Sequence, residues 1–179
     1  DELLTDVTAL GSYISQAAGE EIAFALDDAI VRGPGAGVPL GVLNAACTVS
    51  VAKEGSQAAA TVLYNNVSKM RARMTPRSFL KAEWYVNVDC FPQLEQLFVP
   101  HKNVAGTENV SGQAVWLPPR GAQDPPNGTL FGRPVNVIEH AESIGTVGDI
   151  MLLDLGEYLM TTKGGVQTAS SIHVNFLTD

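Results

Sequence analysis

Three histidines are the residues of this chain best suited to metal chemistry, but their spacing does not make a ligand set. His101, His140 and His173 are far apart, and Glu139-His140-Ala-Glu142 places two carboxylates around a single imidazole. A zinc site takes three or four protein ligands, and no second histidine stands close enough in sequence to complete one. We therefore interpret this segment as a solvated loop, and we predict no metal ion and no cofactor.

Two further groups could act as nucleophiles. Ser171 and His173 lie two positions apart in a β-rich segment, where alternation puts both side chains on one face. The Gly-x-Ser-x-Gly motif of a nucleophile elbow is absent, so a polar strand face is favoured over a catalytic dyad. Cys90 opens a short predicted helix, where a thiolate is favoured, but no histidine is near it in sequence. A half-buried packing role is the better interpretation, and we predict no catalytic residue.

Glycines at positions 33, 35, 37 and 41 invite comparison with a phosphate-binding loop. Their spacing differs from the Rossmann fingerprint, and no Gly-Lys-Ser/Thr follows. The segment also follows a predicted helix, whereas phosphate loops follow a strand and open a helix. We interpret Gly33–Gly41 as a rigid structural elbow, in which Pro39 holds Val38 extended.

Two acidic residues precede that elbow. Asp27 and Asp28 lie near the C-terminal end of the preceding helix, where the helix dipole disfavours negative charge. A solvated helix face is one interpretation. The alternative is that Asp28 holds the elbow in place or meets a basic residue on a neighbouring subunit.

Composition sets broad limits on function. The 179 residues are enough for one medium domain, and only 17% are charged, which often marks surface hidden against partners. The net charge is −8 and no Lys/Arg-rich run appears, which argues against specific nucleic-acid binding. No apolar run reaches about 18 residues, so we expect no membrane span. Cys47 and Cys90 have no metal spacing, which favours free thiols in a reducing compartment.

Helical periodicity governs the first half of the chain. Apolar residues spaced three and four apart predict one long amphipathic helix over residues 1–31, and Gly33-Pro34-Gly35 ends it. A short strand or ordered segment is predicted at 43–51, and a second helix at 58–74. The cations of this second helix stand at its C-terminal end, where the helix dipole favours them: Lys69, Arg71 and Arg73.

Strand patterns govern the second half. A strand is predicted at 83–88, then a short helix that Asp89 caps and that continues through Leu97, then a long, partly mobile loop over 99–128 with a short strand at 114–117. Further strands are predicted at 133–138, 149–153, 158–162 and 166–176, with Lys163-Gly-Gly165 as a hairpin signal. This order predicts the α+β class. The chain opens inside a helix and stops directly after a strand, so we expect it to be a piece of a longer protein.

Several of these segments occur together in one known family. They are a helix ending in Asp27-Asp-Ala-Ile-Val31 before Gly33-Pro-Gly-Ala-Gly-Val-Pro-Leu-Gly-Val-Leu43, then Trp84-Tyr-Val-Asn87, then Leu130-Phe-Gly-Arg-Pro-Val135 before Gly148-Asp-Ile150, Asp154 and Tyr158. In order and spacing, over nearly the whole chain, they resemble the major capsid proteins of tailed bacteriophages, whose fold is shared with bacterial encapsulins.

The resemblance implies a division of the chain. Residues 1–33 and 156–179 would form the peripheral domain, with a spine helix and long strands, and residues 34–155 the axial domain around the five-fold and six-fold vertices. The arm and extended loop that precede the spine helix in this family are missing, so this piece alone is expected to assemble poorly. Some family members join subunits through a Lys–Asn bond, for which Asn175 is the one candidate in the final strand.

The function implied by the resemblance is structural. The chain would be a subunit of an icosahedral phage head, assembling with copies of itself into pentamers and hexamers that enclose DNA, alongside scaffold and portal proteins. It would lie in the virion capsid, and in the bacterial cytoplasm during assembly. The alternatives are an encapsulin-type compartment, for which a cargo pocket in the missing arm would be decisive, and an ordinary α+β enzyme, for which the sequence offers no convergent pair of titratable groups.

Overall fold

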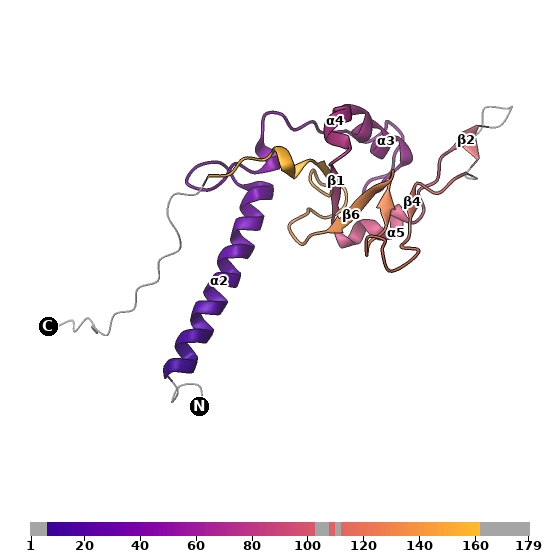
Figure 1. The fold of residues 1–179 in the computed structure, drawn as a ribbon. Coiled ribbons are helices and arrows are strands. Elements are labelled where there is room, and N and C mark those ends of the chain that lie inside the picture. Colours follow the sequence, from indigo (N-terminus) through magenta and orange to yellow (C-terminus); the bar gives the residue numbers. More distant parts are fainter. Residues whose placement is uncertain (1–6, 103–107, 110–111, 162–179) are drawn as a thin grey trace.

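A long helix and a small α+β body make up the structure (Figure 1). The computed structural model describes residues 7–102, 108–109 and 112–161. The helices are α2 (Val7–Arg32), α3 (Tyr64–Arg73), α4 (Pro76–Phe79) and α5 (Phe91–Leu94), with short 3-10 turns at Val42–Asn44, Val88–Cys90 and Leu155–Glu157. The strands are β1 (Glu83–Val86), β2 (His101–Lys102), β3 (Glu108–Asn109), β4 (Trp116–Leu117), β5 (Thr129–Leu130), β6 (Arg133–Val137) and β7 (Ile150–Leu153). The α+β class predicted from the sequence is confirmed.

Helix α2 projects from the body as a rod (Figure 1). It ends where predicted, because the Gly33 amide donates to the Ala29 carbonyl at 2.8 Å and the chain then turns. Residues 1–6 of the predicted helix lie outside the described residues. Most of the helix is exposed: Tyr13 and Phe24 are 63% and 49% exposed, and among residues 10–32 only Val31, in the last turn, is buried.

A mixed five-stranded sheet, in the order β4-β5-β6-β1-β7, forms the centre of the body. Strand β1 runs parallel to β6, pairing Trp84 with Val135, and antiparallel to β7, pairing Trp84 with Leu152. Trp84 and Val86 are both fully buried, as the period-two alternation of a strand requires. The indole N–H of Trp84 donates to the Leu130 carbonyl at 2.9 Å, so this buried polar group is satisfied.

Two apolar clusters hold the body together. The larger one joins α3 and α5 to the sheet through buried residues that include Val67, Trp84, Leu94 and Val135. The smaller one is formed by Val31, Ala141 and Met151, and it attaches the end of α2 to β7 and to the loop before it. The rod is therefore anchored at one end only within the described residues.

The β5–β6 turn contains a strained residue. Phe131 has a φ of 51° and Gly132 a φ of 75°, and a positive φ is unusual for a bulky side chain. The Phe131 ring packs against Tyr64 at 6.0 Å between centroids, and the Arg71 guanidinium lies 5.2 Å from it. These contacts tie the turn to α3, which explains why a bulky aromatic is held in this conformation.

Helix and cap boundaries differ from the sequence predictions at several points. Helix α3 begins at Tyr64 and not at Ala58, because the Asn66 side chain accepts from the Leu63 amide at 2.9 Å and fixes the helix start there. Asn87, and not Asp89, caps the turn after β1, accepting from the Asp89 amide at 3.0 Å. Pro76 opens a helix of its own, α4, which the sequence prediction did not include.

The strand predictions also had mixed success. Strands at 83–86, 116–117, 133–137 and 150–153 are confirmed, whereas 43–51 is an ordered non-strand segment and 158–161 is not a strand. The β2–β3 pair and β5 were not predicted. The predicted 166–176 strand, the Lys163-Gly-Gly165 hairpin and Asn175 lie outside the described residues.

Candidate functional site

The junction where α2 meets the body is the most elaborate polar arrangement in the described part of the chain. It begins with the Gly33–Gly41 elbow. An isolated β-bridge between Pro34 and Leu40 closes this elbow, and the Gly41 amide donates a hydrogen bond to the Gly33 carbonyl at 2.8 Å. The Asn44 side chain donates to the Arg32 carbonyl at 2.7 Å. This carbonyl, at the C-terminal end of the helix, thereby gains a hydrogen-bond partner. The predicted structural elbow is confirmed.

Glycine at position 33 is required by close packing of the backbone. A Cβ there would lie 2.2 Å from the Pro39 carbonyl oxygen and 2.4 Å from that of Ala29, a separation that no side chain tolerates. The elbow therefore fixes the direction in which the chain leaves the helix.

Arg32 links the helix end to the loop before β7. Its Nη2 and Nε donate to the His140 carbonyl at 2.7 and 3.2 Å, and its Nη1 lies 2.9 Å from a Glu142 carboxylate oxygen. One planar guanidinium thus binds two residues of the loop, a geometry that lysine does not reproduce. The Arg32 side chain is 40% exposed, so we assign its ion pair no more than about 1 kcal/mol.

Asp28 and His140 complete the junction. The Asp28 carboxylate lies 3.4 Å from Arg32 Nε and 3.5 Å from His140 Nδ1, and the His140 ring packs on Phe24 at 4.5 Å between centroids. Of the interpretations of Asp28, a direct tie to the elbow is not observed, because its partners are Arg32 and the loop histidine, and its side chain is about half exposed. The solvated-loop prediction for His140 is also wrong, since its side chain is only 12% exposed.

The other candidate site residues are not brought together. Cys90 is fully buried with its Sγ 3.7 Å from the Asp149 carbonyl, and burial, reinforced by the Asp149 charge, raises its pKa to about 11. The packing role is confirmed, and the raised pKa disfavours a thiolate at neutral pH. Cys47 is exposed and unpaired, His101 lies on β2, and Ser171 and His173 lie outside the described residues. Among residues 7–102, 108–109 and 112–161, no group of three potential metal ligands occurs.

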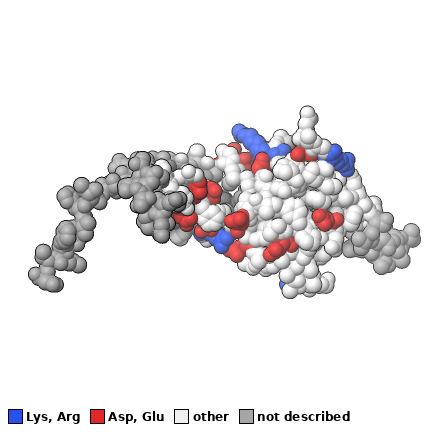
Figure 2. All heavy atoms as spheres, turned by 90° about the horizontal axis from the view of Figure 1, so that it is seen from below, with Lys and Arg blue, Asp and Glu red and all other residues white. Residues whose placement is uncertain are grey.

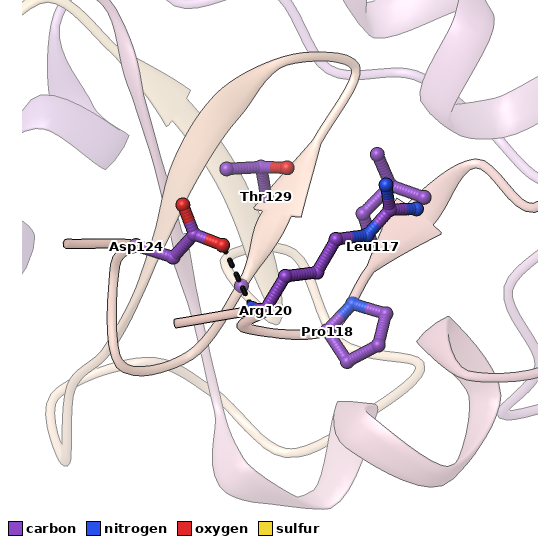
Figure 3. A pocket seen from close by; sticks show the side chains of 6 residues that line it. Leu117, Pro118, Arg120, Asp124 and Thr129 are labelled. Carbon is purple, nitrogen blue, oxygen red and sulfur yellow. Dashed lines mark hydrogen bonds between the residues drawn. The ribbon is translucent and has the colours of Figure 1, made fainter. Parts of the chain in front are cut away.

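The described body contains a small cup and a larger groove. A small cup of about 200 Å³ lies beside β4 and β5 (Figure 3), where the Asp124 carboxylate accepts from the Arg120 amide at 2.7 Å and thereby has a structural role. A larger groove of about 830 Å³ lies between the 42–62 segment, α3 and β7, and its lining is mainly aliphatic. Within the described residues, no helix is both long and apolar enough to cross a membrane.

Solved structures show the class of protein that this fold defines. The chain is similar to the capsid of an empty GTA particle, computed with C5 symmetry, with a TM-score of 0.55 at 19% identity over 86% of this chain and 53% of that one. It is likewise similar to the capsid of a native GTA particle, with a TM-score of 0.53 at 18% identity over 86% and 52% of the two chains. The chain therefore has a capsid-protein fold and spans about half the length of these solved chains.

The sequence itself gives the family. The phage capsid family model matches residues 1–179, and the chain belongs to that family. Among curated proteins no match was found. The resemblance drawn from the elbow and the later strand motifs is confirmed. The Arg32–Glu142 contact had no recognisable sequence signal, because the two residues belong to distant segments that only the fold brings together.

Proposed function

We propose that this chain is a structural subunit of a phage head, a major capsid protein that assembles into pentamers and hexamers around a DNA genome. The family match over the whole chain and the capsid fold support this proposal. A subunit of this kind needs many moderate contacts between copies, and heterologous contacts that close on themselves give rings. Bond-breaking chemistry has no place in this proposed role.

The observation that carries the proposal is the exposed rod. Helix α2 is 26 residues long. Its residues from Gly11 to Ala25 are all exposed, including Ile14 and Ile22. Isolated helices in water are only marginally stable and depend on tertiary packing of an apolar face. Such a helix is suited to a protein whose surface is completed by further chain segments and by copies of itself.

The domain division is part of the proposal. Residues 1–33 and 156–179 would form the peripheral domain and residues 34–155 the axial domain. The contacts at the base of the rod support this division, because the Tyr158 hydroxyl donates to the Leu40 carbonyl at 3.0 Å. That bond links the start of the proposed second peripheral segment to a residue near the beginning of the proposed axial domain, where the peripheral parts would meet.

Partners and location follow from the same proposal. Scaffold and portal proteins of the head would join the copies of this chain, first in the bacterial cytoplasm and then in the virion. The net charge of −8 is suited to a container, since a strongly basic shell would hold packaged nucleic acid tightly.

Assembly of the intact protein tests the proposal. Light scattering and mass photometry would follow purified protein while concentration is raised, and electron microscopy would identify the products. We expect pentamers, hexamers and closed shells. A protein that stays monomeric under every assembly condition, including in the presence of the other head proteins, would contradict the proposal.

A further inference from the structure

Helices α3 and α4 carry a concentration of positive charge that the overall composition conceals. Five of the 11 lysines and arginines of this acidic chain fall between positions 69 and 81, and no Asp or Glu occurs between Glu54 and Glu83. The alternation with uncharged residues kept these cations from forming a recognisable run. All five side chains are exposed: Lys69, Arg71, Arg73, Arg77 and Lys81.

Two of these cations already have partners. Lys69 pairs with Glu54 at 2.5 Å, and the Arg71 guanidinium lies between the Phe79 and Phe131 rings at 5.0 and 5.2 Å. Within the described residues, Arg73, Arg77 and Lys81 form no ion pair. In the sequence, Arg73 and Arg77 precede Leu80 and Lys81 follows it. The Leu80 side chain is 74% exposed. We call Arg73, Arg77, Leu80 and Lys81 the basic patch.

An exposed apolar side chain close in sequence to cations favours a protein partner over nucleic acid. The buried core of a protein interface is apolar, whereas contacts to phosphates come from cationic and other polar groups. The partner surface should therefore combine apolar side chains with acids.

The outer part of α2 has that combination. Tyr13, Glu20, Phe24 and Asp27 follow one another at helical spacing and so share a face, with Glu21 at its margin. Tyr13 and Phe24 are 63% and 49% exposed, and the three acids are exposed as well. Within the described residues, Glu20 accepts a hydrogen bond from Gln16 at 3.0 Å, and none of the three acids forms an ion pair. We call these five residues the acidic helix face.

The two surfaces do not meet within one molecule. Figure 1 shows α4 on the side of the body away from the free end of α2. On the face shown in Figure 2, acidic side chains are spread over the surface, while Lys and Arg lie mostly at one margin. Acidic and basic side chains are therefore largely separated on this face. Complementary surfaces on separate parts of one chain produce a head-to-tail contact between copies, the type that closes into rings.

We propose that the basic patch of one copy docks on the acidic helix face of the next copy, with Leu80 against Phe24. The inference rests on the proposed shell function and names one of its interfaces. It assigns partners to the unpaired cations Arg73, Arg77 and Lys81 and to part of the exposed rod. Complementary charge of this kind sets register and accelerates association.

Charge reversal in the intact protein tests the interface. Arg77→Glu with Lys81→Glu, and separately Glu20→Lys with Glu21→Lys, should each raise the concentration needed for assembly by about tenfold or more, whereas the four substitutions combined should return it to within about threefold of wild type. Lys53→Glu with Arg120→Glu makes the same change in net charge as the first pair elsewhere on the body, and it should have a much smaller effect.

Zero-length carbodiimide cross-linking of a mixture of isotopically light and heavy protein gives an independent readout. It should join Lys81 of one copy to Glu20 or Glu21 of another. Assembly of both reversed variants at the wild-type concentration would overturn the interface while leaving the shell function intact. Loss of DNA binding in the Arg77/Lys81 variant, without any effect of the Glu20/Glu21 variant on assembly, would identify a nucleic-acid surface instead. A wild-type protein that never assembles would contradict the shell function itself.

Discussion

Arg32 is the residue on which the orientation of the rod depends most. Replacing Arg32 with Gln removes two hydrogen bonds to the His140 carbonyl and the ion pair with Glu142, so we expect a loss of about 1–2 kcal/mol in the free energy of unfolding. Asp28→Asn is the matched control. Because Asp28 is about half exposed and Arg32 retains its other partners, that loss should stay below about 0.5 kcal/mol.

Urea denaturation measures both variants, and spin labels on α2 and β7 report whether the rod has become less fixed. Equal losses in the two variants would show that the guanidinium has no special role at the junction. Such a pairing lay beyond sequence analysis, since Arg32 and His140 are 108 positions apart. The sequence showed only that Asp28 stood near the elbow, and the fold gave it different partners.

Cys90 makes the stability depend on pH in the alkaline range. Burial and the Asp149 charge raise the pKa of its thiol to about 11, whereas an unfolded thiol ionises near about 8.5. Between these values the unfolded chain binds fewer protons than the folded chain, so stability falls as the pH rises through this window and is unaffected below it. The loss should reach about 2–3 kcal/mol at pH 11.

Denaturation curves of wild type and Cys90→Ala across that pH range separate this thiol from the tyrosines, which titrate in both proteins. The difference in stability between the two proteins should narrow as the pH rises. A constant difference would contradict the assignment. At neutral pH, iodoacetamide should label exposed Cys47 and reach Cys90 only after unfolding.

At the scale of elements, two glycines of the same segment should respond oppositely to alanine. A Cβ at Gly19 would meet nothing within 4 Å, so Gly19→Ala should stabilise α2 by about 1 kcal/mol. A Cβ at Gly33 would lie 2.2 Å from a carbonyl oxygen, so Gly33→Ala should destabilise the elbow by about 2 kcal/mol or more. Circular dichroism during thermal unfolding measures both, and a stabilising Gly33→Ala would disprove the close approach.

Element types were easier to predict than element boundaries. The 83–88 strand was found because aromatic and β-branched residues dominate it, the 149–153 strand because it is a short apolar run, and the long helix because its apolar spacing is regular. The 43–51 segment has the same β-branched content and yet forms no strand, because pairing depends on a partner that sequence patterns do not specify. Helix α3 begins late for a similar reason: an asparagine side chain, and not propensity, fixes its start.

At the scale of the whole molecule, the family could be predicted from the sequence but the interfaces could not. The elbow and the later strand motifs have a recognisable order, and the matching family model confirms what they indicated. The division of charge between α2 and the α3–α4 region became visible only when the fold placed them on separate parts of the molecule. The net charge of −8 and the lack of a Lys/Arg-rich run had argued only against specific nucleic-acid binding.

That division predicts how assembly responds to salt. The 179 residues of each copy carry a net charge of −8, and this charge repels neighbouring copies over a range of about 30 Å at 0.01 M salt, which shrinks to about 10 Å at 0.1 M and about 3 Å at 1 M. The proposed contact between the basic patch and the acidic helix face acts over a shorter distance than the repulsion. Assembly measured by light scattering should therefore rise from about 0.01 to 0.1 M salt, as the repulsion is screened, and fall towards about 1 M, as the attraction weakens.

The Arg77→Glu, Lys81→Glu variant separates the two effects. Each substitution changes the charge by −2, so the variant carries −8 − 4 = −12 and should show a stronger inhibition at low salt. Without the attractive contact, assembly of the variant should keep rising with salt concentration and should not fall towards about 1 M salt. A wild-type profile that also rises without a maximum would mean that apolar contacts alone join the copies, because such contacts do not weaken as charges are screened.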